Sequence, residues 1–236
     1  MEKGYRNLVY FFGMIVLITF IGFYKKYFSL APDFPGLKHI HHFHAIMLTA
    51  WLGLLVVQPI LIANNKVSFH KFLGKISYFF APVAFISMLL VYHNQYLNFI
   101  NQGQSQKFVL SFVFSPATDA IPFAILYVLA ILNKHETPKH MRYMITTGIV
   151  IGGPGLGRIF MTWLKMDIFM AIQMVTFITL LAFLALIIYD RVNKKVFRVN
   201  PYTIAFFIWL IPNVLIIFFP QTAAWQNFAR WLVSLI

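Results

Sequence analysis

The sequence predicts an all-α, polytopic integral membrane protein with seven transmembrane helices and a C-terminal interfacial helix. Hydrophobic residues make up 60% of the 236 residues and charged residues only 11%, far from the balance of a soluble domain. Seven separate stretches approach the roughly 20 mostly apolar residues that a helix needs to cross a bilayer. Polar residues recur inside these stretches at helical spacing. Little of the chain lies outside them, so we expect one transmembrane domain over residues 1–236.

The predicted spans follow from the apolar runs and from the polar or proline-containing segments between them. They cover residues 7–24, 43–63, 76–93, 108–132, 141–164, 168–189 and 202–219. Residues 221–236 are too few to cross a membrane, but Trp225, Phe228 and Trp231 follow one another at helical spacing. This pattern is typical of a helix that lies in the membrane interface.

The formal net charge is +13, which in a soluble protein would suggest nucleic-acid binding. In a membrane protein, Lys and Arg accumulate in the cytoplasmic loops and set the orientation. With the N-terminus inside, the cytoplasmic side holds twelve Lys and Arg and the outer side at most seven. We therefore expect a multi-pass protein of the cell membrane, a bacterial inner membrane, with a cytoplasmic N-terminus and an external C-terminus. Its surroundings would be the lipid bilayer, with no nucleic-acid partner.

Two ionisable residues interrupt the apolar spans. Asp119 lies near the middle of the fourth span between Pro116 and Pro122, whose missing backbone donors predict a kink. Arg158 lies in the fifth span. Because ionisable side chains are costly in a membrane, both are expected to face the bundle interior and are candidate catalytic residues. Asp119 could carry a proton, anchor a substrate or neutralise a cofactor; alternatively, it forms a structural pair with Arg158.

The fifth span also contains the glycine-rich segment 152–157, with Pro154 at its centre. Glycines allow neighbouring helices to approach closely. We expect Pro154 to break this helix next to Arg158. Such a break could either form a ligand site or serve close packing alone.

Histidine is the candidate ligand for a cofactor because the chain has no cysteine, which excludes thiolate metal sites. His70 and His140 both lie at predicted inner helix starts. His44 and His93 both lie near predicted outer helix ends. Imidazole binds haem iron and transition metals. The first pair could therefore hold one haem b or a metal, and the second pair is a further candidate metal site.

Several of these residues fall in short motifs. A histidine, His44, opens the second span, Gln58 and Pro59 end it, and the stretch 69–75 (FHKFLGK) follows. The stretch 140–144 (HMRYM) opens the span that ends near Arg158. From the second to the fifth span, the chain resembles a bacterial family of multi-pass membrane proteins with a domain of unknown function. The inner histidine pair is similar, in architecture only, to the ascorbate-reducible membrane cytochromes b.

The family resemblance points to His44, His70, His140 and Arg158, with Arg158 included among the cofactor-binding candidates, but it names no reaction. The first functional hypothesis is a membrane b-type-haem redox protein that passes electrons, with a quinone or another redox protein as partner. The alternative is a proton-coupled small-molecule transporter that uses Asp119 and a broken fifth helix. The third hypothesis is a structural membrane subunit that catalyses no reaction. Whether the protein is an enzyme is therefore left open.

Overall fold

The structure is a computed structural model that describes residues 5–195 and 197–234. Within these residues it is entirely helical, without strands, as the sequence predicts. The α-helices are α1 (Tyr5–Tyr24), α2 (His39–Ala63), α3 (Val67–Asn101), α4 (Gln106–Phe112), α5 (Ala120–Leu132), α6 (Thr137–Thr162), α7 (Ile168–Val192), α8 (Pro201–Leu215) and α9 (Ala223–Val233). Three single 3₁₀ turns complete the path: η1 (Phe28–Leu30), η2 (Ser115–Ala117) and η3 (Phe219–Gln221).

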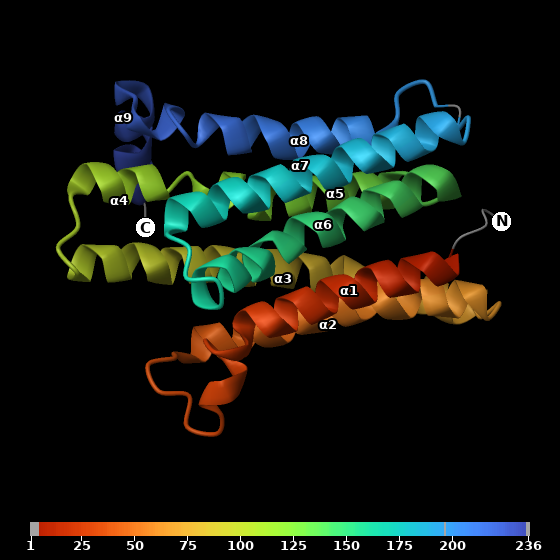
Figure 1. Cartoon of the computed structure of the whole chain (residues 1–236), viewed down its shortest axis with the longest axis horizontal. Helices are drawn as coiled ribbons and strands as arrows, with labels where there is room; N and C mark the ends of the chain where they lie inside the picture. The colour runs from red at the N-terminus through yellow and green to blue at the C-terminus, as the bar shows by residue number, and fades with distance from the viewer. Residues whose placement is uncertain (1–4, 196, 235–236) are drawn as a thin grey trace.

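The long helices run along one common axis and form an elongated bundle (Figure 1). Helix α6 lies in the middle and contacts α1, α2, α5, α7 and α8. The end of the bundle near the start of α1 is called the N-terminal end here, and the other the opposite end; α9 lies at the opposite end, across the bundle axis (Figure 1). In the described part of the chain, seven segments are long and apolar enough to cross a membrane, which confirms the predicted number. Their insertion into a membrane stays a prediction.

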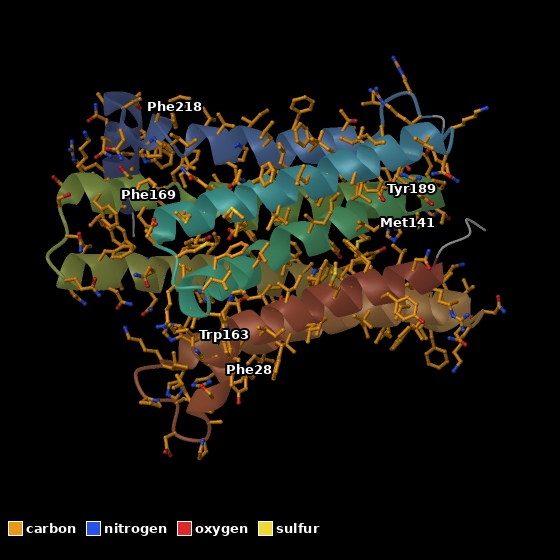
Figure 2. All side chains as sticks on the ribbon, viewed as in Figure 1. Phe28, Met141, Trp163, Phe169, Tyr189 and Phe218 are labelled. Carbon is orange, nitrogen blue, oxygen red and sulfur yellow. The ribbon has the colours of Figure 1, made fainter. Side chains whose placement is uncertain are left out.

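Large apolar side chains point outward along the bundle (Figure 2). Phe169 is 76% exposed, and Tyr189 and Phe218 are more than half exposed. Exposing such a surface to water is unfavourable in free energy, whereas contact with lipid chains avoids this penalty. The arrangement is compatible with a protein that sits in a bilayer.

Helix α3 is much longer than its predicted span of 76–93. It has 35 residues and is therefore about 52 Å long, whereas the hydrocarbon core of a bilayer is about 30 Å thick. Residues 67–75 and 94–101, which lie outside the predicted span, belong to the same helix. Hydropathy detects only the part of a helix that is apolar throughout, so the more polar ends of α3 were missed.

The predicted break at Pro154 is wrong, because α6 is continuous from Thr137 to Thr162. Glycines let α1 pack closely against this part of α6: a Cβ added to Gly155 would lie 2.8 Å from the Cα atom of Thr19. Helix α1 therefore packs directly against the segment of α6 that contains Pro154 and holds it in place. Pro154 is thus accommodated, as proline often is in membrane helices.

The interrupted span is the fourth one. Helix α4 ends at Phe112, the turn η2 follows, and α5 begins at Ala120. Residue 119 is the middle residue of the whole span Gln106–Leu132, so the interruption lies halfway along it. Pro116 and Pro122 each lack a backbone donor, and together they turn the predicted kink into a complete break.

The predicted C-terminal helix exists as α9. The indole nitrogen of Trp225 donates a hydrogen bond of 2.9 Å to the carbonyl of Leu110 in α4. The side chain of Gln226 donates to Ser111 Oγ at 3.0 Å. Helix α9 is therefore fixed to the opposite end of the bundle, and its position in a membrane interface stays a prediction.

Candidate functional site

Five polar residues from four spans gather in the bundle around the break of the fourth span. They are called the midspan cluster here: His44 from α2, Ser87 and Tyr92 from α3, Asp119 from the break and Arg158 from α6. Ser87 is fully buried, whereas the other four are half-buried. The cluster unites His44, Asp119 and Arg158, three of the residues that the sequence singled out.

Asp119 is held by two donors. The hydroxyl of Tyr92 donates a hydrogen bond of 2.7 Å to Oδ2. The backbone N–H of Ala120 donates to Oδ1, so the carboxylate also caps the N-terminus of α5. A negative charge is favoured there because the helix dipole is positive at its N-terminus. The break thus fixes one carboxylate at mid-span.

Arg158 faces this carboxylate without touching it. Its guanidinium donates to the carbonyl of Pro154 at 3.1 Å and lies 4.1 Å from the ring centroid of Phe23. It interacts electrostatically with Asp119. Among the described residues, however, no carboxylate lies within 4.0 Å of it, so the direct structural pair is not formed. A guanidinium has five N–H donors, and only one hydrogen bond from Arg158 is seen in the described chain.

His44 completes the cluster. The hydroxyl of Ser87 donates to the carbonyl of Ala84 at 2.6 Å. It therefore accepts from Nδ1 of His44, 3.2 Å away, and this tautomer leaves Nε2 of His44 with a free lone pair. His44 also interacts electrostatically with Arg158. The imidazole adds a proton acceptor beside the guanidinium.

His93, the expected metal-binding partner of His44, lies elsewhere. It is exposed, and its ring stacks on Tyr96 with 6.4 Å between the centroids. Within the described residues, no three His, Asp or Glu side chains come together in a way that could hold a metal ion. His93 and His44 thus contact different side chains, and the predicted outer metal pair stays a prediction.

His70 and His140, called the histidine pair here, both lie toward the N-terminal end of the bundle, near the starts of α3 and α6. Nδ1 of His140 lies 2.8 Å from the carbonyl of Ala130, and since a carbonyl only accepts, this nitrogen carries the proton. Nε2 of His140 is left as the acceptor. Nδ1 of His70 is buried without a hydrogen-bond partner, as is Oε1 of the nearby Gln58. Both predicted inner ligands thus lie at the same end of the bundle, and their role as a ligand pair stays a prediction.

Three aromatic residues follow the midspan cluster along α2 and α5. Trp51, halfway between His44 and Gln58 on α2, is 1% exposed. Its ring packs edge-on against Phe123 at 5.1 Å and Tyr127 at 5.4 Å. This aromatic layer is closely packed, and the indole Nε1 of Trp51 is buried in it without a hydrogen-bond partner among the described residues.

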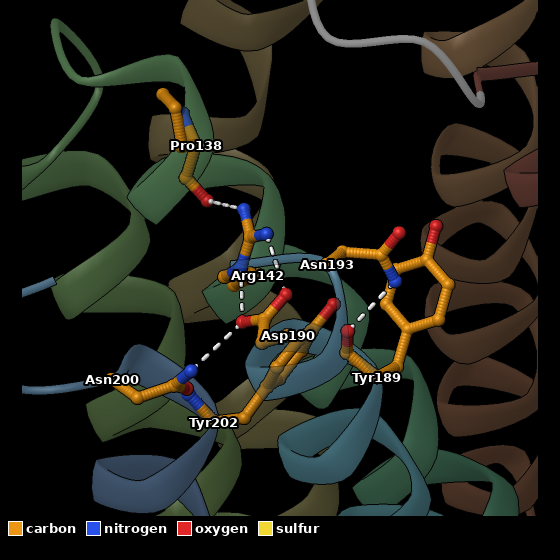
Figure 3. Close-up of polar contacts among 7 residues, drawn as sticks. All are labelled: Pro138, Arg142, Tyr189, Asp190, Asn193, Asn200 and Tyr202. Atoms are coloured by element: carbon orange, nitrogen blue, oxygen red, sulfur yellow. Dashed lines mark hydrogen bonds and ion pairs between the residues drawn. The ribbon is translucent and has the colours of Figure 1, made fainter. Parts of the chain in front are cut away.

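The sequence did not reveal one buried charge pair (Figure 3). Arg142 lies near the start of α6 and is only 1% exposed, so its side chain is surrounded by protein rather than solvent. Its Nε and one terminal nitrogen bind the two oxygens of Asp190, both at 2.7 Å. Asn200 donates to Asp190 at 2.9 Å, and Pro138 accepts from Arg142 at 2.8 Å. This network joins α6, α7 and the start of α8.

Protein-family models, curated proteins and solved structures were compared with the chain, and none of them matches.

Proposed function

We propose that the protein is a proton-coupled transporter of a small anionic solute. In this proposal Asp119 binds the proton and Arg158 binds the anionic group of the solute. The observation that carries it is the break of the fourth span at Asp119, halfway along an apolar segment. The transport hypothesis thereby moves from the fifth span, which is continuous, to the fourth.

An interrupted helix is costly in lipid, because its free backbone groups find no water there. Such interruptions are tolerated where they are covered by protein or line a path for solutes. In transporters, broken helices near the bilayer midplane turn their half-helix ends toward the substrate and the coupling ion. The α5 N-terminus, with Asp119 on it, is an end of this kind.

The charges of the cluster suggest how a proton and an anion would be coupled. Arg158 stays ionised, because a guanidinium is not deprotonated in proteins. While Asp119 is ionised, the two charges compensate each other. Once Asp119 is protonated, Arg158 is an uncompensated cation inside the span, and an anionic solute restores neutrality. Because linkage is reciprocal, the proton favours the anion as much as the anion favours the proton.

The accessibility of the side chains is consistent with a site closed from one side. Four members of the cluster are half-buried, whereas Trp51 and Phe123 of the aromatic layer are each 1% exposed. A solute that moves on toward the N-terminal end would have to displace this layer. The conformation described here would therefore be occluded from that end.

The test is a flux assay in proteoliposomes with the pH indicator pyranine trapped inside. Small carboxylates, amino acids and phosphate are added outside in turn, and solute-driven acidification of the lumen is recorded. We expect at least one anionic solute to drive proton uptake with the wild-type protein. Asp119→Asn should abolish this uptake, whereas Asp33→Asn, which removes an exposed loop carboxylate, should leave it unchanged.

Arg158 gives an independent check on the same assay. Arg158→Gln should raise the solute concentration needed for half-maximal uptake about tenfold or more, since a charge-assisted hydrogen bond is lost. Arg158→Lys should recover part of the affinity. Uptake that is equal in wild type and Asp119→Asn, or no uptake with any anion tested, would contradict the proposal.

A second candidate, electron transfer through one b-type haem between His70 and His140, is favoured by the hydrogen bond of His140 to Ala130. Histidines that ligate a metal usually donate their other ring N–H to a carbonyl or carboxylate. His140 has this arrangement, with Nε2 left for iron. His70 fits less well, because its buried Nδ1 has no partner. A membrane quinone would be a suitable electron donor.

The haem proposal is tested by the visible spectrum of the purified protein, oxidised and then reduced with dithionite. It requires a Soret band with sharp α and β bands after reduction. His70→Ala and His140→Ala should each remove these bands, and His93→Ala, which changes an exposed ring, should not. A colourless protein from haem-supplemented cells would exclude this candidate.

A further inference from the structure

A cavity of about 370 Å³ lies at the opposite end of the bundle, between α3, α4 and α9. Ile100, Val109, Leu110 and Val233 form its apolar wall. Tyr96 and Arg230 add polar groups. No acidic residue is among its described lining residues. The cavity is separate from the midspan cluster and shares no residue with it.

The cavity is fixed because α9 is fastened to α4 by several hydrogen bonds. Trp225 donates to the carbonyl of Leu110, and Gln226 to Ser111 Oγ and to the carbonyl of Pro220 at 2.7 Å. Ser111 Oγ lies 3.1 Å from that same carbonyl. Helix α9 thus forms a wall that does not depend on a ligand.

Arg230 gives the cavity its charge. The side chain is exposed, and its one hydrogen bond among the described residues is a long one, of 3.4 Å, to Asn227. Most donors of the guanidinium are therefore available to a ligand. A planar guanidinium is well suited to phosphate, which it can bind through two parallel hydrogen bonds.

The surroundings of the cavity indicate what kind of phosphate-containing molecule would fit it. Phe228 and Trp231 on α9 are about half exposed, at 47% and 56%. An exposed tryptophan is typical of the level of the lipid headgroups. A ligand with both an anionic headgroup and an apolar chain would match both parts of the cavity.

We propose that this cavity binds one anionic phospholipid. Its phosphate contacts Arg230, and the first part of an acyl chain lies against Ile100, Val109 and Leu110. By bridging α9 and α3, the lipid also holds α4, the half-span that precedes the break. The proposal does not depend on the transport function.

Native mass spectrometry of the detergent-purified full chain tests this proposal. The protein is titrated with phosphatidylglycerol and, separately, with phosphatidylcholine of the same acyl chains. We expect the first phosphatidylglycerol to bind about tenfold more tightly than phosphatidylcholine, as expected for one charge-assisted contact. Arg230→Gln should remove this preference, and Lys26→Gln, which removes an exposed charge just after the end of α1, should retain it.

A second variant tests the apolar half of the cavity. Ile100 lines the cavity and is 47% exposed, so Ile100→Trp can fill the space without disturbing the core. This variant should lose the first bound lipid of either kind while keeping the thermal unfolding midpoint of wild type. Equal binding of the two lipids, an equal loss in Arg230→Gln and Lys26→Gln, or displacement by soluble glycerol phosphate would overturn the proposal.

Discussion

The Arg142–Asp190 pair is a buried ion pair that is costly to desolvate, yet neither partner can be removed without loss of stability. Both side chains are only 1% exposed, and the hydrogen bonds shown in Figure 3 hold them inside the protein. Taking two charges out of water costs several kcal/mol each, roughly offset by their attraction when the geometry is good. The pair therefore adds little net stability, but the loss of one partner leaves an uncompensated charge.

We accordingly predict that Asp190→Asn or Arg142→Met alone lowers the free energy of unfolding by about 3–5 kcal/mol. The double variant Arg142→Met with Asp190→Leu should recover much of this loss, because no unpaired charge remains. Thermal unfolding in mild detergent, followed by tryptophan fluorescence, provides the comparison. Additive losses in the double variant would show that the pair is not coupled.

At this scale, the sequence singles out residues whose chemistry is unusual for their surroundings. Asp119 was found because an acid in the middle of an apolar stretch is unusual, and Arg158 for the same reason. Arg142 was missed because a basic residue at the start of a span looks like a cytoplasmic loop charge. Its partner Asp190 is 48 residues away, and only the packing of α6 against α7 brings them together.

At the scale of elements, the α1–α6 crossing depends on glycines. A Cβ at Gly22 would overlap the carbonyl oxygen of Gly155, which belongs to the backbone and cannot rotate away. Gly13 lies on the same helix, and a Cβ there would meet nothing within 4 Å. The two positions thus form a matched pair, one at a close crossing and one in open space.

Gly22→Ala is expected to destabilise the protein by about 1–3 kcal/mol, because α1 and α6 must move apart. Gly13→Ala should be neutral or stabilising by up to about 1 kcal/mol, because alanine favours a helix more than glycine does. Both changes can be measured as shifts of the thermal unfolding midpoint. The same shift in both variants would refute a special role of the crossing.

The sequence predicts the number of apolar helices but not which one is broken. A proline removes one hydrogen bond wherever it lies, and what happens next depends on its neighbours. At Pro154, adjacent glycines admit α1, which supports a continuous helix. At Pro116 and Pro122 two donors are lost within seven residues, and the carboxylate of Asp119 starts a new helix. Single-sequence patterns do not contain this difference in packing.

For the whole molecule, the distribution of Lys and Arg predicts an N-terminus in the cytoplasm. The chain has no cysteine, so single cysteines can report the orientation without a further change. Gln102 and His135 are exposed and lie in loops at the two ends of the bundle. We expect a membrane-impermeant maleimide to label Gln102→Cys on intact cells and His135→Cys only after permeabilisation. The reverse pattern would invert the assigned topology.

The arrangement of polar groups along the bundle also belongs to this scale. The midspan cluster, the aromatic layer around Trp51 and the histidine pair follow one another between α2, α3, α5 and α6. Helical spacing in the sequence predicted that His44, Trp51 and Gln58 share one face of a helix. The partners from the other helices, such as Tyr92 and Ser87, became known only from the fold.

The account rests most heavily on Asp119 as the group that takes up a proton when solute binds. Difference infrared spectroscopy of the reconstituted protein, with and without the transported anion, tests this directly. The chain has only six acidic residues, so a carboxyl band can be assigned by substitution. We predict that solute binding produces the C=O band of a protonated carboxyl group, which Asp119→Asn removes and Asp33→Asn retains. An unchanged band in Asp119→Asn, or no carboxyl band in wild type, would contradict the account.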